Sequence, residues 1–139
     1  MARSILEAVN ASKIYRAGAI ETRALDGVSI AIETGEFSTL CGPSGSGKTT
    51  LLNLLGTLDR PTSGQILVDG EDTTEMGEAA RAELRLRKLG FVFQSYNLVP
   101  TLTASENITL PMDLAGAKPD QAWLDQVIDT GNLRDRLRH

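Results

Sequence analysis

The first 35 residues alternate between apolar and polar positions in a way that predicts β-strands. In residues 28–33 the branched apolar side chains occupy every second position, and residues 5–11 place Ile5, Val9 and Ala11 on one side of a strand. Turn-forming residues interrupt the pattern at 15–18, 25–27 and 34–35. We therefore expect antiparallel strands over this segment rather than a strand–helix unit.

The next pattern combines a short apolar run with a helical repeat. Residues 37–41 are strand formers that end at Cys41, which we expect to be a small buried side chain rather than a reactive thiol. The following stretch has Leu51, Leu55 and Leu58 at helical spacing and carries leucines on its other faces as well. Because a helix that is apolar all round is a buried one, the pattern predicts a buried strand followed by a buried helix.

The middle of the chain alternates between breakers and short elements. The sequence predicts four segments in order: a breaker cluster at 59–64, a strand at 65–68, a turn at 69–70 and a helix at 78–88. In that helix Ala82, Leu86 and Leu89 fall on one apolar stripe. The arginines and the lysine around the stripe are expected to form a solvated face, and docking of a partner is the alternative for them.

The last third of the chain turns from an apolar run to helices. Residues 90–93 predict a fully buried strand that is ended by Gln94. Thr103 and Glu106 have the spacing of a capping box, which predicts a helix start. A second helix is expected at about 120–130, with a buried side formed by Trp123, Val127 and Ile128.

Composition then bounds the class of protein. A length of 139 residues, with 41% hydrophobic and 23% charged side chains, is typical of one soluble globular domain or part of one. The net charge of −4 argues against nucleic acid as a partner, because surfaces that bind it are usually basic. No apolar run approaches the roughly 18 residues of a membrane span, and the chain does not open with a signal peptide. The single cysteine indicates a reducing cytoplasm.

Residues 42–49 read G-P-S-G-S-G-K-T, which is a phosphate-binding loop of the form G-x-x-x-x-G-K-[ST]. Its glycines allow the backbone N–H groups to point inward around anionic oxygens. A helix that begins near Gly47 would add the positive end of its dipole. Lys48 can reach the β- and γ-phosphates, and the Thr49 hydroxyl can coordinate Mg²⁺. The motif predicts binding of a nucleoside triphosphate.

The order of motifs resembles the ATP-binding subunit of an ABC transporter over essentially the whole chain. Tyr15, the phosphate loop and Phe93-Gln94 carry the resemblance. Residues 54–64, LLGTLDRPTSG, and residues 90–100, GFVFQSYNLVP, are similar to the lipoprotein-release and macrolide-export branch. The resemblance implies an α/β fold of two parts: an N-terminal antiparallel β subdomain with a P-loop NTPase core over residues 1–100, and the start of a helical subdomain over residues 101–139.

The resemblance also implies roles for particular residues. Tyr15 matches an aromatic residue that stacks on the adenine ring. Gln94 matches a glutamine that coordinates Mg²⁺ together with the hydroxyl of Thr49. We therefore expect ATP and Mg²⁺ as cofactors, held by Tyr15, Gly42, Pro43, Ser44, Gly45, Ser46, Gly47, Lys48, Thr49, Thr50 and Gln94.

Two protein partners follow from the same resemblance. A membrane permease is expected to dock on residues 95–114, where Tyr96 and Leu98 follow the glutamine. A second copy of the ATP-binding subunit is expected to pair head to tail with the first. The implied location is peripheral, on the cytoplasmic face of the membrane.

Three parts of the family's pattern do not occur in these 139 residues: a signature of the L-S-G-G-Q type, an apolar strand that ends in Asp-Glu, and a later histidine. That glutamate is the family's candidate base for the attacking water, so we assign no catalytic residue. Residues 1–139 are expected to be an incomplete ATP-binding domain, truncated before the signature. Two alternatives stay open: a non-catalytic truncated paralogue or regulatory ATP-binding module, and a small P-loop kinase.

Overall fold

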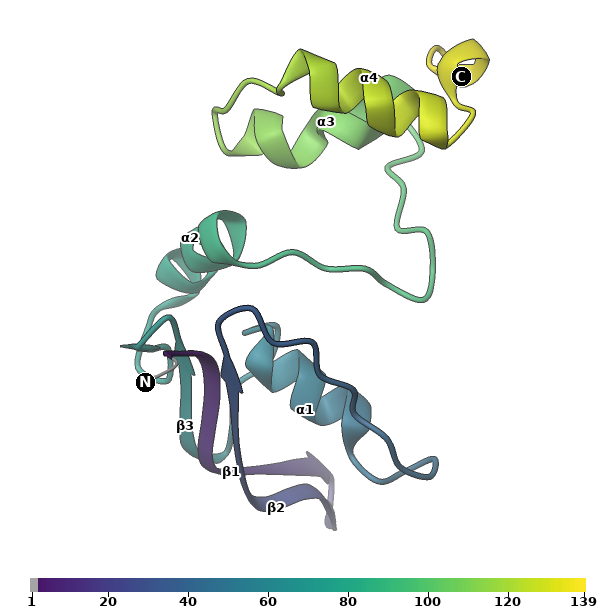
Figure 1. The fold of residues 1–139 in the computed structure, drawn as a ribbon. Helices are drawn as coiled ribbons and strands as arrows, with labels where there is room; N and C mark the ends of the chain where they lie inside the picture. Colours follow the sequence, from purple (N-terminus) through teal and green to yellow (C-terminus); the bar gives the residue numbers. More distant parts are fainter. Residues whose placement is uncertain (1–2) are drawn as a thin grey trace. The chain divides into compact units, whose positions relative to one another are not determined.

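The computed structural model describes residues 3–139, which divide into two units (Figure 1). The N-terminal unit runs to Lys88 and holds a four-stranded sheet with two helices, and the C-terminal unit, Leu89–His139, holds two further helices and a 3-10 turn. The expected order of an antiparallel β subdomain, a P-loop segment and a helical segment is confirmed. Across the described residues, no helix has both the length and the apolar character that crossing a bilayer requires.

Two strands form a long antiparallel hairpin: β1, Ser4–Ala17, and β2, Ile20–Glu33. The antiparallel pairing and the turn at 34–35 are confirmed. The turn predicted at 15–18 begins too early, because residues 15–17 belong to β1 and only Gly18 lies in the turn at 18–19 that joins β1 to β2. The turn predicted at 25–27 is wrong, because these residues belong to β2. Gly27, with φ of 59°, lies where the pairing register shifts, and its N–H donates to the Ser12 hydroxyl at 2.8 Å. The chain therefore forms a bulge at this glycine and the pairing continues past it.

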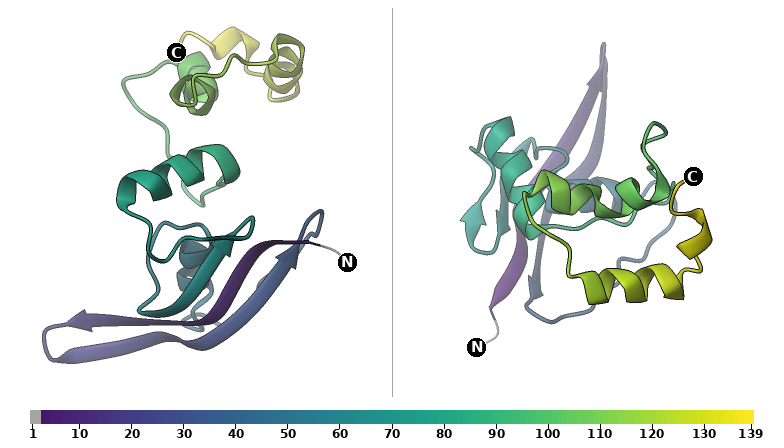
Figure 2. Two further views of the ribbon diagram at one scale, coloured as in Figure 1. Left: turned by 90° about the vertical axis from the view of Figure 1, so that its left-hand side faces the viewer. Right: turned by 90° about the horizontal axis from the view of Figure 1, so that it is seen from above.

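Two shorter strands complete a sheet in the order β2-β1-β3-β4: β3, Ser63–Val68, and β4, Glu71–Asp72. The strand and the turn predicted at 65–70 are confirmed. β3 pairs with residues 6–12 of β1, whereas β2 pairs with β1 as far as Ala17. The far end of the hairpin, which carries Tyr15, therefore projects beyond β3 (Figure 2).

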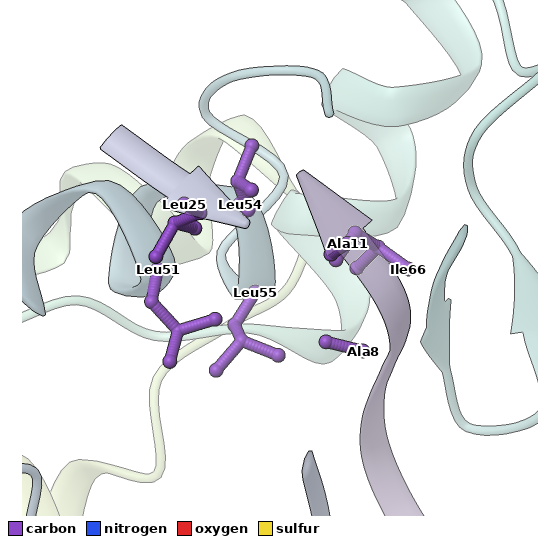
Figure 3. Packing of buried hydrophobic residues seen from close by; sticks show 7 residues of the cluster. All are labelled: Ala8, Ala11, Leu25, Leu51, Leu54, Leu55 and Ile66. Atoms are coloured by element: carbon purple, nitrogen blue, oxygen red, sulfur yellow. The ribbon is translucent and has the colours of Figure 1, made fainter. Parts of the chain in front are cut away.

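Helix α1, Lys48–Leu55, packs one face against the sheet. Its buried leucines join apolar residues of the three longer strands in one core (Figure 3), made of Ala8, Ala11, Leu25, Leu51, Leu54, Leu55 and Ile66. The prediction of a helix buried on every side is wrong, since Leu52 and Leu58 are exposed. The sheet covers one face of α1 only, and Leu58 lies beyond the last helical residue.

Both predicted buried strands outside the hairpin are wrong. Residues 37–41 and 90–93 have no strand structure, Phe37 is 92% exposed, and Cys41 is exposed rather than buried. A strand forms only where a neighbour takes up its N–H and C=O groups. Among residues 3–139 no strand pairs with either segment, so both remain extended coil.

Helix α2, Glu78–Lys88, has the predicted bounds but a different buried face. Its buried residues are Arg81, only 4% exposed, and Leu84, while Ala82 and Leu86 of the expected stripe are exposed. The prediction of a solvated basic face is therefore wrong for Arg81. Its guanidinium donates to the carbonyls of Thr57 at 2.6 Å and Asp59 at 2.7 Å, just after α1 ends.

This contact has an electrostatic cause. The carbonyls of Thr57 and Asp59 lie just past Leu55, the last residue of α1, and a hydrogen bond from a charged guanidinium to a carbonyl is stronger than one from a neutral donor. Arg85 donates to the Thr57 carbonyl as well, at 2.8 Å, and Glu78 accepts from both arginines. Burial lowers the pKa of Arg81 from its ordinary value, with the neighbouring Arg60 adding to the shift. The arginines of α2 thus close the end of α1.

The C-terminal unit contains three short elements: α3, Ala104–Leu114, α4, Gln121–Thr130, and a 3-10 turn, Arg134–Arg136. The two predicted helices are confirmed. The predicted buried side of α4 is wrong in part: Ile128 is buried, but Trp123 is 63% exposed and Val127 is exposed. The last two line a groove between α3 and α4, of about 250 Å³, rather than a closed core.

The start of α3 is a complete capping box. The Thr103 hydroxyl accepts from the Glu106 N–H at 3.2 Å, and a Glu106 carboxylate oxygen accepts from the Thr103 N–H at 2.7 Å. The N–H groups of Ala104 and Ser105 donate to the carbonyls of His139 and Leu137. The first turn of α3 is therefore satisfied by side chains and by the last residues of the chain.

The capping box predicts a pH effect that replacing Glu106 by glutamine removes. The Thr103 backbone N–H, with its hydroxyl, lowers the pKa of Glu106 below the ordinary value of 4.5. Its stabilising contribution is present above pH 4.5 and is lost as the pH falls through the lower, folded-state pKa. Glutamine accepts the same bond without titrating. We expect circular dichroism to show less acid loss of helix in Glu106→Gln than in the wild type. Equal losses would contradict this.

Candidate functional site

The loop that precedes α1 lies against strand β2. Gly47 is the N-cap of α1 and has φ of 93°, which favours glycine. A Cβ at Gly47 would lie 2.6 Å from the carbonyl oxygen of Ala24 and 2.9 Å from a methyl group of Leu25. Both the backbone conformation and the close approach therefore require glycine, which explains locally why the loop can pack on the hairpin.

The first turn of α1 presents backbone N–H groups to the loop. The Leu51 N–H donates to the Gly47 carbonyl at 2.9 Å, so the helix ladder begins there. No side chain among residues 3–139 caps this end of α1. The N–H groups of Lys48, Thr49 and Thr50 form the positive end of the helix dipole, an arrangement that suits an anion.

Lys48 brings a full positive charge to the same loop. Its ammonium group donates to the carbonyls of Gly42 at 2.6 Å and Pro43 at 2.7 Å, and lies 3.4 Å from the Ser46 hydroxyl. The side chain thus folds over the loop formed by residues 42–47. Because a lysine ammonium is a compact charge on a flexible stem, it can turn from these carbonyls to phosphate oxygens at little cost.

These groups line one recess of about 550 Å³, a size that accommodates a small ligand. Its walls come from β2 and from the loop with the start of α1: Thr22, Arg23, Ala24, Ser44, Gly45, Gly47, Lys48, Thr49 and Thr50. Sequence reasoning missed the three residues of β2. No motif marks them, because the pairing of β1 with β2 and the packing of the loop put them there.

Tyr15 lies on β1 and is connected to the recess through one residue of its wall, Thr22. It pairs across the hairpin with Thr22, so the two Cβ atoms are about 4.5–5.5 Å apart. Its side chain is 42% exposed, and its hydroxyl donates to Asp59 at 3.1 Å. The ammonium group of Lys13 lies over the ring, 5.2 Å from its centre. Neither Lys13 nor Asp59 was expected from the sequence.

Gln94 belongs to the C-terminal unit and is exposed at a bend between α2 and α3. The recess consists of residues of the N-terminal unit alone, so the role of Gln94 as a metal ligand stays a prediction. Within residues 3–139, no group of three or more His, Cys, Asp or Glu side chains is arranged to hold a metal ion.

The fold that carries this recess has counterparts among known proteins. The family model described as "ABC transporter" matches residues 25–139. The chain belongs to the ABC transporter family. The ABC transporter match covers the loop, α1, α2 and the whole C-terminal unit.

Two curated ABC proteins are similar to this chain. It is 40% identical over 139 residues to the lipoprotein-releasing system ATP-binding protein LolD of Shewanella frigidimarina, which covers 99% of this chain and 58% of that protein. It is 48% identical over 112 residues to the macrolide export ATP-binding/permease protein MacB of Syntrophobacter fumaroxidans, which covers 81% of this chain and 16% of that protein. The expected resemblance to the lipoprotein-release and macrolide-export branch is confirmed.

A solved ABC structure has the same fold. The ATP-binding cassette MJ0796, described as a dimer in a post-hydrolysis state bound to ADP and Pi, superimposes with a TM-score of 0.83 at 35% identity. The match covers 96% of this chain and 60% of the MJ0796 chain. This chain therefore spans less than two thirds of the length of the ABC proteins LolD and MJ0796.

Proposed function

We propose that this chain is the ATP-binding portion of an ABC transporter ATPase and that it holds the triphosphate of ATP in the recess at the start of α1. The convergence of the α1 N-terminus, the Lys48 ammonium and the glycine-rich loop on one recess carries the proposal. Free N–H groups, a dipole end and a mobile cation together suit a polyphosphate better than any of them alone.

Each part of the recess then has a role. The loop residues 42–47 and the first N–H groups of α1 surround the phosphate oxygens, and Lys48 neutralises their charge. Tyr15 stacks on the adenine. Tyr15 is the cross-strand partner of Thr22, which lines the recess, and this pairing supports the role.

The oxygen donors available suit Mg²⁺. The Thr49 hydroxyl belongs to a residue that lines the recess, and the Gln94 amide is exposed. Neutral hydroxyl and amide oxygens are ligands that this hard cation accepts alongside phosphate and water. Mg²⁺ would offset the charge of the triphosphate there. We assign these residues to binding, and no residue of this chain to activation of the attacking water.

The relatives support a proposal for the activity of the whole protein. We propose that it powers export or lipoprotein release through a membrane permease, on the cytoplasmic face of the membrane, with two ATP-binding subunits paired head to tail. Residues 95–114 are the proposed permease contact, since Tyr96 and Leu98 there are exposed. Exposed apolar side chains of this kind suit a protein interface.

Calorimetric titration with ATP and Mg²⁺ tests the binding proposal. The wild-type protein should bind ATP, and Lys48→Ala should bind at least about tenfold more weakly, because the charged hydrogen bonds to phosphate are lost. Lys118→Ala, an exposed lysine of the C-terminal unit, is the matched control and should bind as the wild type does. Equal affinities of the wild type and Lys48→Ala would refute the site.

A further inference from the structure

Three side chains from two distant parts of the sequence meet at the projecting end of the hairpin. Lys13 and Tyr15 lie on β1, and Asp59 lies in the loop after α1. One carboxylate oxygen of Asp59 accepts from the Lys13 ammonium at 2.9 Å, and the other accepts from the Tyr15 hydroxyl at 3.1 Å. Because Lys13 also lies over the Tyr15 ring, the three groups form a closed set of contacts.

The surroundings hold this set in place. Lys13 is the most buried member, with a side chain 14% exposed, and its ammonium also donates to the Arg60 carbonyl at 2.7 Å. Burial alone would raise the pKa of Asp59, but the hydrogen bonds from Lys13, the Arg60 N–H and Tyr15 outweigh burial and lower it. The carboxylate therefore stays charged and keeps both of its partners through the neutral range.

The geometry gives the two faces of the Tyr15 ring different environments. The ammonium of Lys13 lies over one face, within the distance at which a cation is attracted to an aromatic ring. The hydroxyl is tied to Asp59, which limits rotation of the side chain. A ring that is already fixed loses less conformational entropy when a ligand stacks on it.

We propose that Lys13 and Asp59 are positioning residues that hold the Tyr15 ring ready to stack on the base of the nucleotide. This inference rests on the proposed function, because it assumes that Tyr15 contacts the adenine. The cation draws electron density from one face of the ring, and the other face then stacks more strongly on an electron-rich purine. The contribution of Lys13 should therefore strengthen binding of the base and leave binding of the triphosphate unchanged.

Two ligands distinguish a positioning role of Lys13 at the Tyr15 ring from a general contribution of Lys13 to binding of the whole nucleotide. ATP carries the base, and inorganic tripolyphosphate carries the phosphates alone. Affinities of both, as Mg²⁺ complexes, should be measured for the wild type, Tyr15→Ala, Tyr15→Phe and Lys13→Met. Methionine keeps the length and apolar character of the lysine stem while removing the charge. We expect Lys13→Met to weaken ATP binding by about three- to tenfold and to leave tripolyphosphate binding unchanged.

The variants also test whether Lys13 acts through Tyr15. In a Tyr15→Ala background, Lys13→Met should weaken ATP binding no further. Tyr15→Phe, which keeps the ring and loses only the hydroxyl bond to Asp59, should give a smaller loss than Tyr15→Ala. A thermal melt of each variant checks that the hairpin is intact, and Asp59→Asn gives a second route if Lys13→Met does not fold.

Each outcome decides between the two proposals. Equal weakening of both ligands by Lys13→Met, or no weakening of either, would overturn the positioning role. Unchanged ATP affinity in Tyr15→Ala would overturn the contact between Tyr15 and the base. Failure of the wild type to bind either ligand would instead refute the proposed function itself.

Discussion

Replacing Gly64 by alanine is expected to lower the free energy of unfolding of the N-terminal unit by about 3–5 kcal/mol. Gly64 lies in β3 with φ of 85°, a backbone conformation that costs alanine about 1–2 kcal/mol. A Cβ there would also overlap the carbonyl of Asn10 and lie 2.6 Å from the carbonyl oxygen of Val9. Since both neighbours are backbone atoms of β1, relief requires the two strands to separate.

Gly70→Ala is the matched control for this effect. Gly70 has nearly the same φ, 82°, but nothing lies within 4 Å of the position of its Cβ. The free energy of unfolding of Gly70→Ala should fall by about 1–2 kcal/mol, which is the cost of placing alanine in this backbone conformation. Urea unfolding followed by circular dichroism measures both variants. Equal losses would contradict the close packing of β3 on β1.

Replacing Arg81 by methionine is expected to cost about 2–4 kcal/mol. Methionine keeps the apolar stem but leaves the Asp59 carbonyl, and in part the Thr57 carbonyl, without the donor that Arg81 supplies. The Asp59 carbonyl is partly buried, and an unsatisfied acceptor costs up to about 1–3 kcal/mol as its burial increases. An exposed ion pair contributes under about 1 kcal/mol.

Arg87→Met is the control for Arg81→Met, because it removes the same type of side chain from the same helix. Arg87 is exposed and pairs with Glu83 on the surface of α2. Its loss should change the free energy of unfolding by less than about 0.5 kcal/mol. A similar small change for Arg81→Met would mean that the α2 arginines do not close the end of α1.

Features that depend only on residues close together in the sequence were predictable. The capping box needs only Thr103 and Glu106, and the phosphate loop needs only eight consecutive positions, so both follow from the sequence. The bounds of α2 follow from its local pattern as well. In each case the groups that make the interactions lie within one or two turns of each other.

Features that depend on distant partners were not predictable. Residues 37–41 have the composition of a strand, but within the described range 3–139 no strand lies beside them to pair with. The sequence around Arg81 indicates a surface residue. Its burial depends on the carbonyl of Thr57, which is 24 positions away in the sequence. The β2 wall of the recess depends in the same way on the hairpin register. The sequence thus located the glycine-rich loop of residues 42–49 but not the β2 residues that form the other wall of the recess.

The most direct test of ATP binding at the recess is a thermal melt of the protein with and without ATP and Mg²⁺, run beside Lys48→Ala. If ATP binds at the recess, ATP at about 100 times its dissociation constant should stabilise the wild type by about 2.7 kcal/mol. Lys48→Ala lacks the ammonium that lies over the loop. If it binds ATP at least about tenfold more weakly, the same ATP concentration should stabilise it by at most about 1.4 kcal/mol. Equal rises in both proteins, or no rise in the wild type, would contradict ATP binding at this loop.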